Sequence, residues 1–308
     1  MNAIKKLKAF GKADIKKRFK RISPFYVILF IVLLLLCLSL LIPFLWALMT
    51  SVKDQLDFNA DVLAFPRVWR FENYAEVFSG FAVKVRWGSG TISFSMLTMV
   101  LFSIAYSVGG ALIQTVSCAL VAYAVAKFSH FKISKILYVI VIVTMILPIV
   151  GSLPSEIRIL KALGLYNTPG VLALKANFLG AYFLVFHAFF CGIPKDFFEA
   201  AEIDGAGNGR ILWNVVFPMT QGILFTVFIL YFLGNWNDYN VTLVYAPSYP
   251  TLAYGLYYFT NQNMNPLIAS VPHKMAGSMI VFAPIFMFFC MFSNKLLGSN
   301  LTLGGIKE

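Results

Sequence analysis

The sequence predicts an all-α, polytopic membrane protein with six transmembrane helices, and three observations support this fold class. Hydrophobic residues make up 59% of the 308 residues, and charged residues make up only 12%. Soluble domains are about 45–50% apolar and about 25% charged. The mean hydropathy is +0.79, and several long stretches contain no Asp, Glu, Lys or Arg. These observations exclude a disordered chain, a coiled coil and an ordinary soluble enzyme.

The uncharged stretches define the six expected helices. A bilayer core of about 30 Å needs about 20 apolar residues that rise about 1.5 Å each. The first stretch follows a basic arm at 1–23 and is too long for the apolar core of a signal peptide, so we expect an uncleaved helix. The expected spans of the membrane domain at 24–298 are about 24–50, 96–127, 134–152, 172–193, 213–243 and 274–297.

Glycine and proline decide where several spans begin or end. The second uncharged stretch opens with Gly88-Ser89-Gly90, so its helix is placed after this cluster of helix breakers. The third stretch reaches Pro148 and Pro154. Residues 239–273 are also uncharged, but they contain four prolines. This last stretch is therefore expected to be an external loop with a short helix at most.

Basic residues predict the orientation in the membrane. Nine of the 25 Lys and Arg residues lie between Lys5 and Arg21. With this arm inside the cell, the inner segments hold sixteen basic residues and the outer segments hold nine. Because the inner segments of membrane proteins carry the excess of Lys and Arg, both termini, including the tail at 299–308, are expected to be cytoplasmic. This arrangement of basic residues indicates that the chain interacts with a lipid bilayer and does not bind nucleic acid.

The segment between the fourth and fifth spans, 194–213, is unlike an ordinary loop. It contains four of the 13 acidic residues, together with an Ala200-Ala201 pair that favours a helix. Asp196 is expected to cap this helix, and Gly205 is expected to supply a turn that a Cβ atom would obstruct. A short acidic helix with small residues suits docking, because a carboxylate such as Glu199 can pair with an arginine of a partner.

The motif Glu199-Ala200-Ala201-x-x-Asp204-Gly205-Ala206, followed by Phe217-Pro218, resembles the EAA signature of binding-protein-dependent ABC-transporter permeases. Over roughly residues 25–308 the chain resembles the maltose-type carbohydrate permeases, on the side of the shorter, six-helix subunit. The stretches that carry this resemblance include Ser51-Val52-Lys53, Ala122–Phe128, Trp236-Asn237-Asp238-Tyr239 and Gly304-Gly305-Ile306-Lys307. The stretch between Asn73-Tyr74 and the second span is longer than is usual in this family.

The resemblance implies a type I ABC importer permease architecture and a function in the import of a sugar or an oligosaccharide. In such importers a second homologous permease subunit completes the pore, two ATPase subunits dock below it, and an extracellular binding protein delivers the solute. In these importers ATP-Mg binds the ATPase subunits. We therefore expect that this chain is not an enzyme and that it holds no cofactor and no metal. It contains no G-x-x-x-x-G-K-[ST] phosphate-binding loop. The positions that the resemblance assigns to ATPase coupling are Glu199, Ala200, Ala201, Asp204 and Gly205.

Asp238 is the only acidic residue between Asp204 and Glu308, and it lies in the outer half of a span. A charge in hydrocarbon costs about 2.5–3.5 kcal/mol on insertion scales, so Asp238 is expected to face a wet cavity or a paired partner. Packing against the second permease is the alternative. Polar groups beside aromatic rings suit sugar recognition, and the candidate substrate pathway is Asn235, Trp236, Asn237, Asp238 and Tyr239. Asp238→Ala is expected to lower uptake while leaving assembly intact.

Two other functions stay open at this point. The first is an ABC importer permease for a solute that is not a sugar. The second is a stand-alone secondary transporter, which would bury several ionisable residues for ion coupling; this chain offers little beyond Asp238 and His187. In each case the expected location is the bacterial cytoplasmic membrane, which the chain crosses several times.

Overall fold

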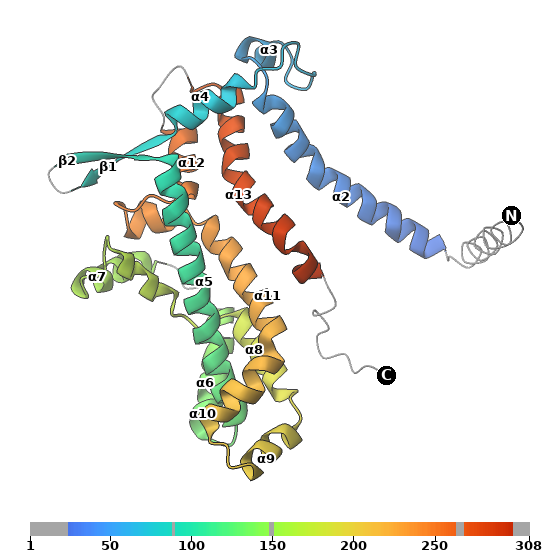
Figure 1. Cartoon of the computed structure of the whole chain (residues 1–308), viewed down its shortest axis with the longest axis vertical. Helices are drawn as coiled ribbons and strands as arrows, with labels where there is room; N and C mark the ends of the chain where they lie inside the picture. Colours follow the sequence, from blue (N-terminus) through green and yellow to red (C-terminus); the bar gives the residue numbers. More distant parts are fainter. Residues whose placement is uncertain (1–23, 88–89, 148–150, 263–267, 298–308) are drawn as a thin grey trace, which may run out of the picture.

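The computed structural model describes residues 24–87, 90–147, 151–262 and 268–297 (Figure 1). The predicted basic arm at 1–23 and the predicted tail at 299–308 lie outside the described residues. The first part of the described chain comprises α2 (Pro24–Ser51), α3 (Gln55–Ala60), α4 (Glu72–Gly80), β1 (Ala82–Trp87), β2 (Gly90–Ser95), α5 (Met96–Lys127), α6 (Lys132–Ile146), α7 (Leu153–Ala162) and η1 (Pro169–Lys175). The second part comprises α8 (Ala181–Cys191), α9 (Lys195–Ile203), α10 (Asn208–Ile211), η2 (Leu212–Val216), α11 (Phe217–Trp236), η3 (Val241–Tyr245), α12 (Leu252–Asn261) and α13 (Val271–Leu297).

Four helical segments are long and apolar enough to cross a membrane. They are Pro24–Ser51, Met96–Lys127, Asn208–Trp236 and, within α13, Val271–Phe288. The other two expected spans correspond to shorter helices, α6 with 15 residues and α8 with 11. At about 1.5 Å per residue these helices rise about 22 Å and about 16 Å, which is less than a bilayer core of about 30 Å. The described part of the chain therefore contains four full-length spans rather than six.

The expected third span, 134–152, is too long at its C-terminal end. α6 begins at Lys132 and ends at Ile146. The next residue, Leu147, has an extended backbone with φ −82° and ψ 119°. It precedes Pro148 in the sequence, and the ring of a proline disfavours a helical conformation in the residue before it.

The expected fourth span, 172–193, is divided into two elements. η1 is a 3-10 helix that ends at Lys175, and α8 begins only at Ala181. Between them, the backbone N–H of Leu179 donates to the side-chain oxygen of Asn177 at 2.9 Å. Such a local turn competes with helix formation, which explains why the apolar run does not continue as one helix.

The expected fifth span, 213–243, begins and ends earlier than predicted. The helical segment runs without interruption from Asn208 to Trp236 and includes the π-helical turn η2. In that turn the N–H of Phe217 donates to the carbonyl of Leu212, five residues back. Pro218 follows directly, and a proline inside a helix has no N–H to donate and clashes with the carbonyl four residues earlier. The wider turn accommodates this proline without breaking the helix.

The all-α prediction missed a β-hairpin. β1 and β2 pair antiparallel over six residues each. Val83 and Val85 alternate with Lys84 and Arg86, and this period of two buries the valines at 1% and 7% exposure while the basic residues are exposed. The hairpin occupies the stretch whose length differs from the family pattern. The alternation is a strand signal that the emphasis on Gly88-Ser89-Gly90 as a breaker overlooked.

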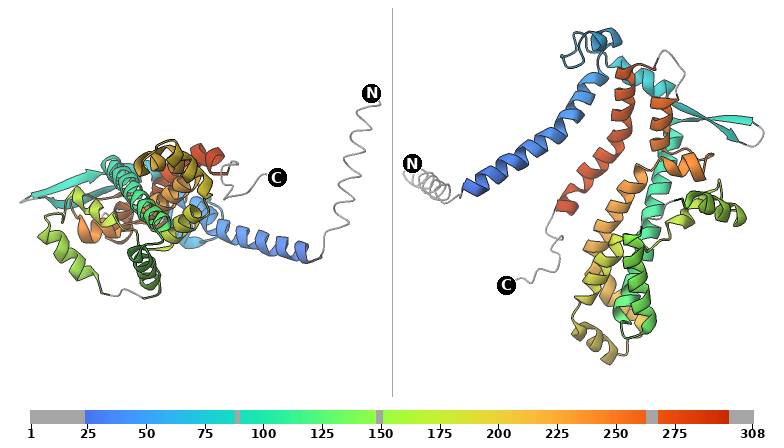
Figure 2. Two further views of the ribbon diagram at one scale, coloured as in Figure 1. Left: turned by 90° about the horizontal axis from the view of Figure 1, so that it is seen from below. Right: turned by 180° about the vertical axis from the view of Figure 1, so that it is seen from behind.

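Two hydrophobic clusters at opposite ends of α5 hold the bundle together. The first joins the N-terminal half of α5 to α4, β1, α12, α13 and the end of α11. The second joins the C-terminal half of α5 to α6, α8, η2 and the start of α11. Figures 1 and 2 show these regions at the two ends of the elongated bundle. We call them the α4 end and the α9 end.

α2 diverges from the bundle, as the blue ribbon in Figure 1 shows. Its only buried residues are Thr50 and Ser51, in the last turn. Further back, Phe44 contacts Phe282 of α13 with ring centroids 5.1 Å apart. The remaining apolar surface is exposed, and a surface of this kind is stable in a bilayer or against another apolar subunit.

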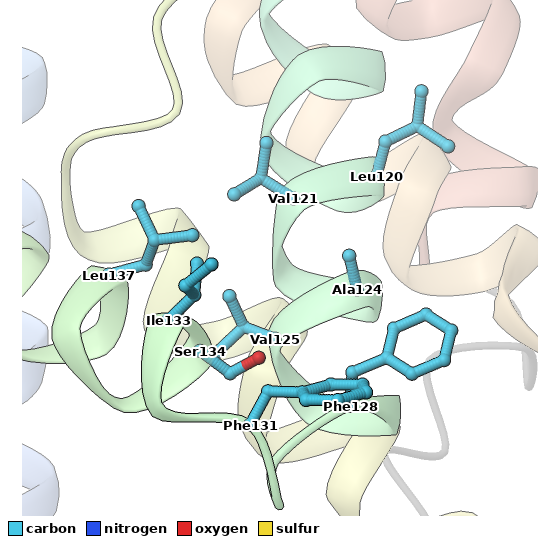
Figure 3. Close-up of a pocket in the computed structure, with 9 residues that line it drawn as sticks. All are labelled: Leu120, Val121, Ala124, Val125, Phe128, Phe131, Ile133, Ser134 and Leu137. Atoms are coloured by element: carbon cyan, nitrogen blue, oxygen red, sulfur yellow. The ribbon is translucent and has the colours of Figure 1, made fainter.

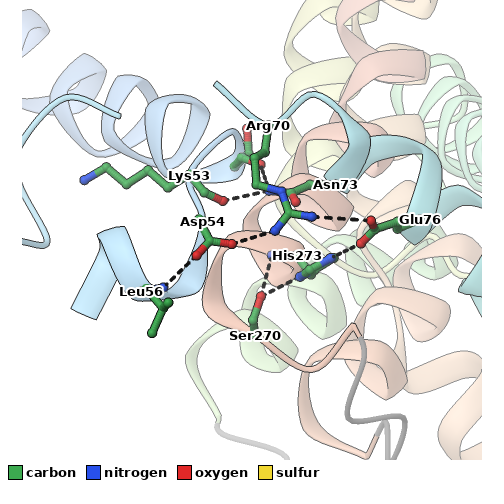
Figure 4. A network of polar contacts seen from close by, with 9 residues as sticks. Lys53, Asp54, Leu56, Arg70, Asn73, Glu76, Ser270 and His273 are labelled. Carbon is green, nitrogen blue, oxygen red and sulfur yellow. Dashed lines mark hydrogen bonds and ion pairs between the residues drawn. The ribbon is translucent and has the colours of Figure 1, made fainter. Parts of the chain in front are cut away.

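A polar network at the α4 end connects the segment after α2 with α4 and α13 (Figure 4). The guanidinium of Arg70 lies 2.6 Å from Asp54 and 3.7 Å from Glu76. The hydrogen bond from Arg70 holds the pKa of Asp54 below its usual range. Glu76 also contacts His273 of α13 at 2.8 Å, so one carboxylate connects two parts of the chain that are far apart in the sequence.

Asn73→Ala is expected to weaken the attachment of α2 to the bundle by about 2 kcal/mol. The Asn73 side chain is 1% exposed and donates to the backbone carbonyls of Ser51 and Lys53, each at 2.9 Å. Leaving buried acceptors without a donor costs about 1–3 kcal/mol. Thermal unfolding in detergent should show a midpoint about 4–8 °C lower. Asn59→Ala, at an exposed position on α3, is the control; equal midpoints for the two variants would contradict the prediction.

Candidate functional site

The segment that resembles the EAA signature forms the short helix α9, which lies at the surface of the α9 end (Figure 1). No residue of α9 is buried. Phe198 and Ala201 pack against the second hydrophobic cluster. The ammonium group of Lys127, at the end of α5, lies 3.8 Å from Glu202 and 5.2 Å from the centre of the Phe198 ring. α9 is therefore attached along one side to the end of a long membrane helix.

The opposite side of α9 is free and combines apolar with acidic groups. Ile203 is 86% exposed and Phe197 is 48% exposed. Glu199, Ala200 and Asp204 are exposed as well. Exposed large apolar residues beside carboxylates on one helix are typical of a surface that another protein covers.

Gly205 ends α9 in a left-handed turn. Its φ is +74°, a conformation that glycine adopts without the strain that other residues incur. The N–H of Gly205 donates to the carbonyl of Glu202, and the N–H of Ala206 donates to Ala201 at 2.9 Å. This pair of bonds is a Schellman motif. A Cβ atom placed on Gly205 would meet no atom within 4 Å apart from its own chain neighbours. The expected obstruction by a Cβ is therefore local: at positive φ the Cβ crowds the adjacent backbone, and the φ of +74° confirms the expected glycine turn.

The structure does not contain the helix cap that was expected from the Asp196 side chain. The N-cap of α9 is Pro194, and no side chain makes a capping hydrogen bond there. Asp196 lies in the first turn, where a carboxylate interacts favourably with the helix dipole. The start of α9 is therefore set by the proline and by this charge.

α9 is connected to the other end of the bundle by a single helical rod. The chain turns at Gly205 and then continues from Asn208 to Trp236. These 29 residues rise about 43 Å. Asp238 lies two residues beyond the end of the rod, so one continuous helical segment joins the turn after α9 to the second candidate site.

Asp238 is held by four contacts at the point where the rod ends. One carboxylate oxygen accepts a hydrogen bond from the Tyr106 hydroxyl at 2.9 Å and lies 3.3 Å from the Lys175 ammonium. The other oxygen accepts from the backbone N–H groups of Asn240 and Val241 at 3.1 and 3.3 Å. The side chains of Lys175 and Asp238 are 19% and 23% exposed. Of the two environments expected for Asp238, the structure places it with a paired partner.

This pairing changes the expectation for Asp238→Ala. The substitution would remove the anchor of Tyr106 and leave the half-buried Lys175 without a counter-charge. We therefore expect it to destabilise the chain and not only to lower uptake.

The other four candidate pathway residues lie in different surroundings. Asn235 and Trp236 are each 4% exposed, and the Asn235 side chain donates to Gln114 of α5 at 3.0 Å. Asn237 is exposed and donates to the Leu233 carbonyl. Tyr239 is 38% exposed and stacks on Tyr257 of α12, with centroids 5.0 Å apart and planes inclined by 6°. Only Asn237 and Tyr239 present accessible surface in the isolated chain.

Sequence reasoning did not find the groups that surround these residues. Lys175 and Tyr106 lie 63 and 132 residues from Asp238 in the chain. Gly110 lets α5 approach α11 closely, because a Cβ atom there would lie 2.8 Å from the Asn235 side-chain nitrogen. In the sequence, Lys175 is a basic residue beside an apolar run, and it contributed only to the predicted orientation in the membrane. No local sequence pattern pairs it with Asp238.

Comparison with known proteins gives relatives along most of the chain. The chain is 26% identical over 295 residues to the diacetylchitobiose uptake system permease protein of Streptomyces coelicolor, which covers 94% of this chain and 90% of the relative. It is 24% identical over 294 residues to the arabinooligosaccharides transport system permease protein of Bacillus subtilis, with 92% and 97% covered. It is also 27% identical over 214 residues to the sn-glycerol-3-phosphate transport system permease protein of Yersinia pestis, with 70% and 72% covered.

A solved structure supports the fold. The structure matches, with a TM-score of 0.69, a chain in the crystal structure of a bacterial ABC transporter involved in the import of the acidic polysaccharide alginate. The match covers 88% of this chain and 95% of the other at 21% identity. The match shows that this chain shares its fold with that transporter chain.

The family model described as "Binding-protein-dependent transport system inner membrane component" matches residues 118–298, which is more than half of the chain. The matched region contains α9, the rod and Asp238. The chain belongs to the family of binding-protein-dependent transport system inner membrane components.

Proposed function

We propose that this chain is the non-catalytic permease subunit of an ATP-driven importer that translocates a sugar or an oligosaccharide delivered by an extracellular binding protein. The observation that carries the proposal is α9 itself: a short surface helix with an exposed apolar and acidic face, attached to a rod that runs to Asp238. Family membership supports the presence of a binding protein and of ATPase subunits.

In this proposal the free face of α9 fits a groove on an ATPase subunit. Phe197 and Ile203 supply the apolar contact, and Glu199 and Asp204 supply carboxylates for basic groups of the ATPase. ATP-Mg binds the ATPase subunits and not this chain. Closure of the ATPases moves α9, and the Gly205 turn passes the movement to the rod.

The proposed topology has six membrane passages with both termini in the cytoplasm. α6 and α8 are too short to span the bilayer core alone, so the proposal requires that neighbouring segments complete their passages. η1 precedes α8 in the chain and packs beside α5 through Val171 and Tyr106. A second homologous permease subunit supplies the other half of the pore.

The substrate class rests on the relatives and on the chemistry around Asp238. Two of the relatives named above are oligosaccharide uptake permeases by their names. Tyr239 and Tyr257 offer a stacked aromatic surface at the end of the rod, and aromatic faces suit sugar rings. The glycerol-3-phosphate relative favours a second candidate, a small phosphorylated or otherwise non-sugar solute.

The proposal is tested by purifying the full chain in mild detergent from its native cells and identifying every co-purifying protein by mass spectrometry. A second permease and an ATPase are expected. Binding of sugars and of glycerol phosphates to the associated binding protein then separates the two substrate classes. Purification of the chain as a functional monomer or homo-oligomer would overturn the proposal in favour of a stand-alone transporter.

Glu199→Lys is expected to remove most of the co-purifying ATPase. The substitution places a cation where the proposal requires a carboxylate, and a reversed interfacial charge costs several kcal/mol. Glu72→Lys, at an exposed acidic position in the first turn of α4, is the matched control. The ratio of ATPase to permease in the purified complex is the measurement; an equal ratio in both variants would contradict the role of the α9 face.

A further inference from the structure

An apolar groove lies between the end of α5 and the start of α6 (Figure 3). Its volume is about 520 Å³. The residues that line it are Leu120, Val121, Ala124, Val125, Phe128, Phe131, Ile133, Ser134 and Leu137. On α5 it extends from Leu120 to Phe128, which corresponds to about 12 Å of helix. It is therefore an elongated, open apolar groove that begins at the α9 end and follows α5 and α6.

One polar group lines this groove without a protein partner. Ser134 is 7% exposed, and Figure 3 shows its hydroxyl oxygen directed among the lining side chains. Its hydroxyl makes no hydrogen bond with any described residue. The hydroxyl oxygen is not fully enclosed by protein, so a ligand with a hydrogen-bond acceptor near the end of the groove can reach it.

Two lysines belong to the same helical turn as the lining residues Ile133 and Ser134. Lys132 and Lys135 are exposed and flank the lining residues Ile133 and Ser134 on the first turn of α6. Neither forms an ion pair with a described residue. The neighbouring Lys127 is different, because it is paired with Glu202.

The start of α6 adds further positive potential. α6 has 15 residues, and no side chain caps its N-terminus. The N–H groups of a first helical turn have no partner within the helix and attract anions together with the helix dipole. The first turn of α6 thus carries two ammonium groups without an ion pair, backbone N–H groups without a helical partner, and the Ser134 hydroxyl that lines the groove.

We propose that this groove binds an anionic phospholipid of the surrounding bilayer. One acyl chain lies in the groove, and the phosphate lies at its mouth between Lys132, Lys135 and the first turn of α6. Basic pockets between membrane helices bind anionic headgroups, and a basic residue near an anionic membrane surface contributes about fivefold in affinity. The apolar lining explains why the ligand carries a long chain, and the charges explain why it is anionic.

The bound lipid also supports the attachment of α9. Val125 lines the groove and belongs to the cluster against which Phe198 and Ala201 pack. A filled groove therefore holds the end of α5 in the position from which Lys127 reaches Glu202. This inference goes beyond the proposed function, since it assigns a ligand site that does not touch the transported solute.

The site is tested by native mass spectrometry of the full chain with its co-purifying subunits. The delipidated complex is titrated with phosphatidylglycerol and with phosphatidylcholine of identical acyl chains. We expect phosphatidylglycerol to bind more tightly by at least tenfold. Lys132→Gln/Lys135→Gln should reduce its affinity about 25-fold, since each lysine contributes about fivefold. The control Lys84→Gln/Arg86→Gln, which removes two exposed charges on β1, should leave the preference unchanged.

A second variant tests the acyl chain. Ala124 is exposed and lines the groove, so Ala124→Phe fills the groove without disturbing the core and should reduce the binding of both lipids. Ala105→Phe, at another exposed position of α5, is the control. A photo-crosslinking residue at position 124 in the complex should capture phospholipid.

Three outcomes would overturn the lipid site. They are equal affinity for the two lipids in the unaltered chain, unchanged binding in both groove variants, and capture of a protein subunit at position 124. Each of these readouts is independent of transport and ATP hydrolysis, so their failure would leave the proposed importer function standing.

Discussion

Gly205→Val is expected to lower coupled transport at least tenfold while the membrane domain stays folded. Gly205 holds φ at +74° in the turn that ends α9. A left-handed conformation costs a residue with a side chain about 1–2 kcal/mol, and more for a β-branched side chain. A difference of about 2 kcal/mol shifts the balance between the formed and unformed turn about 30-fold. Because α9 lies at the surface, the loss falls on α9 and not on the core.

Two variants separate the turn from a general effect of added volume. Gly205→Asn should keep most of the activity, since asparagine tolerates the left-handed conformation. Gly207→Val should be nearly neutral, because Gly207 has φ −72° and ψ 164° and a Cβ there meets nothing within 4 Å. The measurements are solute uptake and substrate-stimulated ATPase activity of the complex in proteoliposomes. Normal coupling in Gly205→Val would contradict the proposed role of the turn.

Lys175→Met is expected to destabilise the chain by about 3 kcal/mol and to abolish uptake. The substitution leaves the half-buried carboxylate of Asp238 with one hydroxyl and two backbone N–H groups. Removing one partner of a buried ion pair costs about 3–5 kcal/mol, because the other charge is left uncompensated. η1 then loses its link to the end of the rod.

The double variant Lys175→Met/Asp238→Asn decides whether charge pairing is the cause. Asparagine can keep the contact with Tyr106, and no uncompensated charge remains, so most of the stability should return. Lys84→Met, at an exposed position of the hairpin, is the control for loss of a lysine. Thermal unfolding in detergent and uptake in proteoliposomes are the measurements. A double variant that is as unstable as Lys175→Met would exclude the pairing as the source of the effect.

The two substitutions act at opposite ends of one rod. Gly205 precedes the helical segment Asn208–Trp236, and Asp238 follows it. If the rod transmits movement, then each variant should impair transport although only Lys175→Met reduces stability strongly. The contrast between the two therefore distinguishes loss of coupling from loss of structure.

Several features of this chain follow from local sequence patterns alone. The apolar runs predicted two of the long spans closely: α5 is Met96–Lys127 where 96–127 was expected, and α2 is Pro24–Ser51 where 24–50 was expected. A long uncharged run is a local signal for a membrane helix, and α2 stays helical although Pro43 lies inside it. The turn at Gly205 was also visible, because glycine after a short helical pattern is a local signal.

Other features depended on segments that the sequence keeps far apart. The Asn177 turn and Pro148 shortened two expected spans. Whether such a helix breaker interrupts an apolar run depends on how the rest of the chain packs around it. The β-hairpin needs Val83 and Val85 to be covered by the rest of the α4 end, which a pattern of alternation does not establish by itself.

The sequence by itself determined the class of protein, the positions of the long apolar helices and the location of the short acidic helix, because hydropathy, helix breakers and glycine act within a few residues. Only the tertiary structure decided that Asp238 is paired with Lys175, that the rod connects α9 to this pair, and that the groove beside Ser134 exists. These features arise where α5, α6, η1 and α11 meet. The ion pair and the groove depend on distances between segments that are far apart in the sequence, and no local sequence pattern contains these distances.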